Sequence, residues 1–127
     1  MKADILLKKA EALANLDGAA NLDAAEAIVN QIRSRVSLPV LASTVKASKA
    51  TMLDAILKER RLELAFEGQR WFDLVRYNKV EEVMNSINSR DSGRLPQRRG
   101  FTENSYLFPI PSTAIDLNTN LVQNPGY

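Results

Sequence analysis

Residues 57–83, LKERRLELAFEGQRWFDLVRYNKVEEV, decide the fold because they place charges inside a strongly apolar helical pattern. The helix begins near Thr51, where Thr51-x-x-Asp54 fits a capping box with Asp in place of Glu, and we expect it to stop at Gly68. Its polar residues gather on one narrow wedge, and most of the remaining circumference is apolar. Such a pattern is typical of a central helix that neighbours bury on two sides.

Two charges fall on the apolar side of this helix. Arg60 lies within one apolar stripe, and Glu59 lies on the edge of a second stripe that contains Leu62 and Phe66. An unpaired buried charge is strongly destabilising, so both side chains need partners of opposite charge. We therefore predict a structural lattice of ion pairs that joins this helix to the next one, formed by Glu59, Arg60, Glu63, Glu67, Arg70, Asp73 and Arg76.

The rest of the chain is also helical in its pattern. Apolar residues at helical spacing predict two helices that pack as an antiparallel hairpin over residues 4–36. Residues 37–50 are small and polar and indicate a connector, after which residues 51–87 hold the central helix, an aromatic-rich segment and a short helix. We expect Trp71 of the aromatic segment to pack in a core or an interface.

The last forty residues lack this periodicity. Residues 88–105 predict a long polar loop, and Pro109 and Pro111 keep the following stretch extended. The tail of residues 106–127 is too apolar to be free, so we expect it to pack against the helices through Leu107, Phe108, Ile110, Ile115 and Leu121. The sequence therefore predicts one all-α domain over residues 1–127, a helical hairpin plus a central buried helix and a packed tail.

The composition excludes several kinds of chemistry. The 127 residues carry a net charge of +2 and contain no His and no Cys, which excludes Ser-His-Asp triads, thiol nucleophiles and thiolate metal sites. We expect no catalytic residue, metal site or cofactor. The basic excess lies within residues 90–99, which indicates a solvated arginine-rich loop rather than a nucleic-acid interface. Met1-Lys2-Ala3-Asp4 does not resemble a signal peptide, and the chain has no Cys that could be lipidated.

Two sharper hypotheses concern possible ligand chemistry. Glu63 and Glu67 lie one helical turn apart and could form the acid/base pair of a glycoside hydrolase, but the nearby arginines favour ion pairs instead. Phe101 and Tyr106 flank the arginine-rich loop and are the candidate ligand-binding residues, since exposed aromatic rings can stack on a sugar.

Five ordered motifs resemble the C-terminal end of SusD/RagB-type proteins. They are Glu59-Arg60-Arg61, the stretch ELAFEG from Glu63 to Gly68, Arg70-x-x-Asp73-Leu74-x-Arg76, Pro109-Ile110-Pro111 and Gln123-Asn124-Pro125-Gly126-Tyr127. The hairpin also looks like the helix pair that precedes this signature in the family. One departure is Arg35-Val36-Ser37, where the family commonly has Arg-Ala-Gly.

The resemblance implies a tetratricopeptide-like scaffold and a function. Proteins of this type are lipoproteins on the outer membrane of Bacteroidetes, exposed at the cell surface, that bind oligosaccharides or other nutrients and pass them to a SusC-like, TonB-dependent transporter. They are binding proteins rather than enzymes. The resemblance covers only the C-terminal part of such a protein, so we expect this chain to be mainly structural and the lipid anchor to lie elsewhere. The alternative is a free-standing helical protein-interaction module.

Overall fold

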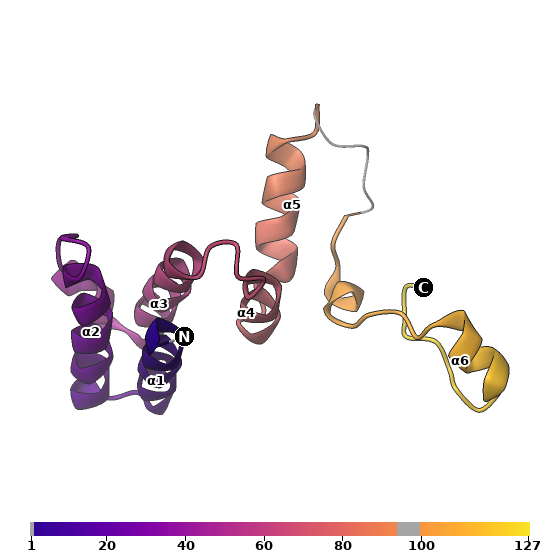
Figure 1. The fold of residues 1–127 in the computed structure, drawn as a ribbon, viewed down its shortest axis with the longest axis horizontal. Helices are drawn as coiled ribbons and strands as arrows, with labels where there is room; N and C mark the ends of the chain where they lie inside the picture. The colour runs from indigo at the N-terminus through magenta and orange to yellow at the C-terminus, as the bar shows by residue number, and fades with distance from the viewer. Residues whose placement is uncertain (1, 94–99) are drawn as a thin grey trace. The chain divides into compact units, whose positions relative to one another are not determined.

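The computed structural model describes residues 2–93 and 100–127, and all regular elements within these ranges are helical (Figure 1). The predicted all-α class is therefore confirmed. The contacts divide the chain into two compact units, Met1–Arg70 and Trp71–Tyr127. The single domain expected over residues 1–127 stays a prediction, and Arg94, Arg98 and Arg99 of the expected basic loop lie outside the described residues.

The first unit is built around the expected hairpin. Helices α1 (Lys2–Leu16) and α2 (Ala19–Ser34) pack against each other, and α3 (Lys49–Glu63) packs against both (Figure 1). The hairpin turn is tight because Asp17 and Gly18 both have positive φ angles, 59° and 86°. Asp17, the first residue after α1, takes the left-handed φ that ends this helix, and Gly18, whose positive φ carries no steric penalty in glycine, is the N-cap of α2.

The core of this unit consists of small and aliphatic side chains from all three helices. Alanines of α1 and α2 allow the helix backbones to approach closely, and larger side chains fill the remaining space. The buried members are Leu7, Ala10, Ala14, Leu22, Ala25, Val29, Ile32, Met52 and Ile56. The helical periodicity in the sequence therefore identifies the faces that are buried.

Both ends of α3 differ from the expectation. The capping box at Thr51 and Asp54 was wrong: Ser48 is the N-cap, and its Oγ accepts a hydrogen bond from the Thr51 backbone N–H at 3.2 Å. Thr51 occupies the third helical position and its Oγ1 accepts from the Ser48 N–H, also at 3.2 Å. The short 3₁₀ helix η1 (Ser43–Ala47) ends directly before this cap and is tied to it, because Thr51 Oγ1 donates to the Val45 carbonyl at 2.7 Å.

The helix also ends earlier than Gly68. After Glu63 the chain enters a turn in which Phe66 has a φ of 67° and Gly68 a φ of 72°. Since the helical register is lost here, Phe66 does not extend the inward stripe and its side chain is fully exposed. Leu62 is also exposed, so the placement of these two residues inside a core was wrong.

The second unit contains helices α4 (Arg70–Arg76) from Trp71 onward, α5 (Val80–Arg90) and α6 (Ser112–Leu117), with the 3₁₀ helix η2 (Glu103–Tyr106) between the last two. The short helix expected up to residue 87 continues to Arg90, so the expected loop of residues 88–105 starts later and ends in η2. Leu74 and Val80 are its buried aliphatic side chains among the described residues.

The tail is held mainly by side-chain amides rather than by apolar burial. Gln123 pairs with the Ile110 backbone: its Oε1 accepts from the Ile110 N–H at 2.8 Å and its Nε2 donates to the Ile110 carbonyl at 2.9 Å. Of the five side chains expected to pack, Ile110 and Ile115 are half-buried, whereas Leu107, Phe108 and Leu121 are exposed. The expectation that these three side chains are covered was wrong for the chain as described.

Candidate functional site

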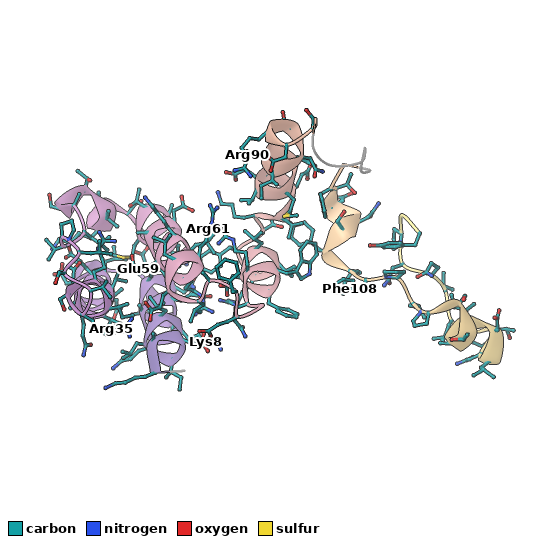
Figure 2. All side chains as sticks on the ribbon, turned by 45° about the horizontal axis from the view of Figure 1, so that its top comes forward. Lys8, Arg35, Glu59, Arg61, Arg90 and Phe108 are labelled. Carbon is teal, nitrogen blue, oxygen red and sulfur yellow. The ribbon has the colours of Figure 1, made fainter. Side chains whose placement is uncertain are left out.

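Two glutamates of α3 form ion pairs with arginines at the end of the hairpin. Glu59 is buried, and its Oε2 accepts a hydrogen bond from Arg33 Nη1 at 2.9 Å. Arg33 is fixed from the other side because its Nε donates to the Pro39 carbonyl at 2.7 Å. Glu63 pairs with Arg35, which lies just beyond α2 (Figure 2). These pairs connect α3 to α2.

Arg60 forms the deepest ion pair of the first unit. Its side chain has no exposed surface, and its Nη2 lies 3.0 Å from Oδ1 of Asp4 on α1. Lys8, one turn further along α1, donates to Asp4 Oδ2 at 2.9 Å. The hydrogen bond from Lys8 and the interactions with Arg60 hold the pKa of Asp4 below its usual value of 3.8, against the opposing effect of burial.

The remaining members of the predicted lattice lie around the start of α4. Arg70 Nη1 donates to the Leu57 carbonyl at 3.4 Å, and the buried Asp73 accepts from Arg76 Nη2 at 2.9 Å. Glu67 is exposed. A lattice that joins α3 to the next helix stays a prediction.

Sequence reasoning missed the partners that the hairpin supplies, namely Asp4, Arg33 and Arg35. They lie more than 25 residues from their partners on α3 in the sequence. A signal is present nonetheless, because Asp4 and Arg33 are charged residues that border the apolar stripes of their helices. A charge at such an edge is suited to pair with a buried charge on a neighbouring helix.

An aromatic cluster in the second unit consists of Trp71, Phe101 and Phe108. The ring centroid of Trp71 lies 6.1 Å from that of Phe101 and 6.0 Å from that of Phe108, both in tilted orientations (Phe108 is labelled in Figure 2). Asn85 of α5 fixes Phe101 by two hydrogen bonds of 2.8 Å, from the Phe101 N–H to Oδ1 and from Nδ2 to the Phe101 carbonyl. Trp71 thus packs against other rings, and Phe101 is fixed beside it.

The two candidate ligand-binding residues line separate hollows of the second unit. Phe101 lines a hollow of about 370 Å³ together with Asn104, Gly126 and Tyr127. Tyr106 lines a more open hollow of about 710 Å³, whose other lining residues include the acidic side chains of Glu81, Glu82 and Glu103. The sequence did not indicate Asn104 or Tyr127, because the first hollow forms only when segments more than 20 residues apart meet.

Residues 2–93 and 100–127 contain no group of three or more His, Cys, Asp or Glu side chains arranged to hold a metal ion. No helix in these ranges combines the length and the apolar character that a membrane span requires.

Comparison with known proteins identifies the family of the chain. A model of the SusD family matches residues 2–127. The chain belongs to the SusD family. SusD-like protein P38 of Formosa agariphila is 40% identical to it over 131 residues, which cover 98% of this chain and 23% of that protein. SusD-like protein P2 of the same organism is 33% identical to the chain, and the match covers 98% of this chain and 25% of that protein.

Solved SusD structures have the same fold as this SusD-family chain. A SusD superfamily protein from Bacteroides vulgatus has a TM-score of 0.77 at 27% identity, and the match covers 98% of this chain and 26% of that one. A SusD-like protein from Bacteroides fragilis has a TM-score of 0.74 at 30% identity, and the match covers 98% of this chain and 25% of that one. The chain therefore spans about a quarter of the length of these SusD relatives.

Proposed function

We propose that this chain is a mainly structural segment of a protein that captures a nutrient, most simply an oligosaccharide, at the outer membrane of Bacteroidetes. In this proposal the ligand is delivered to a SusC-like, TonB-dependent transporter, and the lipid anchor lies outside residues 1–127. The observation that carries it is the match of the SusD family model to residues 2–127.

The interactions within the chain support a structural role. The motifs that resemble the family supply buried ion pairs and backbone clamps: Arg60 is 1% exposed, and both polar atoms of the Gln123 side chain bond the Ile110 backbone. Side chains committed in this way hold the fold and are not free to contact a ligand. We therefore propose that the protein binds its nutrient without converting it chemically.

Calorimetry tests this proposal. The 127-residue chain and the longest open reading frame that contains it are titrated with the same panel of neutral and acidic oligosaccharides. We expect the longer protein to bind at least one oligosaccharide about tenfold or more tightly than the chain, a difference of about 1.4 kcal/mol. Absence of binding by the longer protein to the whole panel, or turnover of an oligosaccharide by it, would overturn the proposal.

A free-standing helical protein-interaction module is the second candidate. It is favoured by large apolar side chains that the chain leaves exposed, such as Phe66, Phe72 at 61% and Leu117 at 90%. Exposed apolar surface of this kind is typical of protein contact sites. This candidate predicts a monodisperse chain that melts cooperatively and binds no saccharide, whereas a molten chain that binds a hydrophobic dye would count against it.

A further inference from the structure

The described side chains that line the hollow beside Phe101 are uncharged, and Tyr127, the last residue of the sequence, adds a negatively charged α-carboxylate. Its walls combine the aromatic rings of Phe101 and Tyr127 with the polar side chains of Thr102, Asn104 and Ser105. An ion placed there would lose part of its hydration without gaining an opposite charge from these side chains, which is unfavourable. These side chains therefore favour neutral, polar ligands over anions, which the α-carboxylate of Tyr127 also repels.

Asn104 supplies a side-chain amide to the lining of this hollow. Ser105 Oγ already accepts from the Thr102 N–H at 3.1 Å. The Asn104 amide is half-buried and has no hydrogen bond to another residue in the ranges 2–93 and 100–127. A primary amide both donates and accepts, so it can satisfy a hydroxyl group in either role.

Gly126 keeps the space beside this amide open. Its φ angle is 96°, and a Cβ atom at this position would lie 3.0 Å from Asn104 Cβ and 3.3 Å from Nδ2. Any other residue would therefore both strain the backbone and displace the Asn104 side chain. Glycine at this position leaves the amide available at the surface of the hollow.

The two aromatic walls are fixed before any ligand arrives. Asn85 holds the backbone of Phe101, and the Tyr127 hydroxyl donates to the Leu107 carbonyl at 3.0 Å. Asn124 Nδ2 adds a hydrogen bond of 2.6 Å to the Phe108 carbonyl and so holds the segment that carries Tyr127. Tyr127 remains 58% exposed, which leaves ring surface for contact. Fixed walls reduce the entropy lost on binding.

We propose that this hollow is a subsite for one ring of a neutral saccharide. The C–H face of the sugar packs against Tyr127, and a ring hydroxyl forms hydrogen bonds with the Asn104 amide. The inference rests on the proposed function, since it names the class of nutrient that this segment contacts. The Tyr106 hollow is less suited to the role, because its three glutamates are only partly offset by the Lys79–Glu82 ion pair at 2.9 Å.

Nuclear magnetic resonance of the ¹⁵N-labelled chain tests this subsite. The probes are xylohexaose and laminarihexaose as neutral saccharides and hexagalacturonate as the charged one. We expect at least one neutral probe to shift amide signals of residues 100–105 and 126–127, and hexagalacturonate to leave them in place. Asn104→Ala and Tyr127→Ala each weaken this binding about tenfold, the effect of one lost favourable contact.

Phe72→Ala is the matched control, because Phe72 is exposed to a similar extent as Tyr127, 61% against 58%, and does not line the hollow. It leaves the affinity within about twofold, as for other surface substitutions. Asn104→Asp keeps the side-chain shape and also weakens binding of the neutral probe, which separates loss of the amide donor from misfolding.

Three results would overturn the subsite: no shift in residues 100–105 and 126–127 with either neutral probe, equal shifts with hexagalacturonate, or equal losses in Phe72→Ala and Tyr127→Ala. The proposed function fails separately. If the protein encoded by the longer reading frame binds an oligosaccharide while the amide signals of residues 100–105 and 126–127 do not shift, only the subsite is wrong.

Discussion

Single side chains in this protein are stabilised by partners that lie far away in the sequence. Arg60 illustrates this, since its guanidinium is completely buried and its ion-pair partner Asp4 lies 56 residues earlier. The sequence identified Arg60 as a buried charge from its place in an apolar stripe. Asp4 borders an apolar stripe of its own helix, but periodicity did not identify it as the partner of Arg60, because it describes one helix at a time and carries no information on which helices meet.

Replacement of Arg60 tests this burial. Arg60→Leu removes the charge opposite Asp4, and we expect the free energy of unfolding to fall by roughly 3 kcal/mol. Arg61→Leu is the control, because the adjacent Arg61 is exposed (Figure 2) and its replacement should cost only about 0.5 kcal/mol. Urea unfolding followed by circular dichroism measures both, and equal effects of the two substitutions would contradict the burial of Arg60.

The low pKa of Asp4 makes stability depend on pH. Because the folded state holds this pKa below the usual 3.8, the carboxylate adds stability that is complete above about pH 4 to 5 and is lost as the pH falls through the lower, folded value. Lys8→Met removes the hydrogen bond that contributes most to the shift, so the pKa of Asp4 should rise. A carboxyl-detected pH titration measures it, and an unchanged pKa in Lys8→Met would show that this hydrogen bond is absent in solution.

At the scale of elements, side-chain amides of the second unit hold its irregular segments in place by hydrogen bonds to their backbone. Asn85 holds Phe101 and Gln123 holds Ile110, each through a donor and an acceptor on the same side chain. The two hydrogen bonds satisfy the backbone N–H and C=O of one residue, as a neighbouring β-strand would. They therefore position segments that lie outside any helix or sheet.

The two hydrogen bonds between Asn85 and the Phe101 backbone, the Asn85 clamp, can be tested by tryptophan fluorescence. Trp71 is the only tryptophan and lies against Phe101. Asn85→Ala frees the Phe101 segment, so we expect Trp71 to become more solvated and its fluorescence emission to shift to longer wavelength. Asn88→Ala, on the same helix and without a side-chain hydrogen bond to a described residue, should leave the emission in place. The clamp would be contradicted if the two variants had the same spectrum.

The sequence predicted the helices better than their ends. Apolar spacing located the hairpin and α3, since periodicity reflects burial directly. The cap at Ser48 and the early end of α3 were missed, because both depend on individual backbone angles, such as the positive φ of Phe66. For the site, exposed aromatics suggested Phe101 and Tyr106, but their separation into two hollows depends on how distant segments meet.

At the scale of the whole molecule, the chain is about a quarter of the length of its SusD relatives and leaves several large apolar side chains exposed. Under the proposed function, these residues belong to a longer nutrient-binding protein whose other segments carry the principal ligand site and the lipid anchor. The 127 residues then provide a helical scaffold and one saccharide subsite.

Sequencing the source locus upstream of the Met1 codon tests this proposal most directly. We predict that the open reading frame continues upstream to a signal peptide followed by a Cys that can be lipidated, and that a gene for a large TonB-dependent transporter lies beside it. A stop codon and a ribosome-binding site directly upstream of Met1 would contradict the proposal and favour the free-standing interaction module.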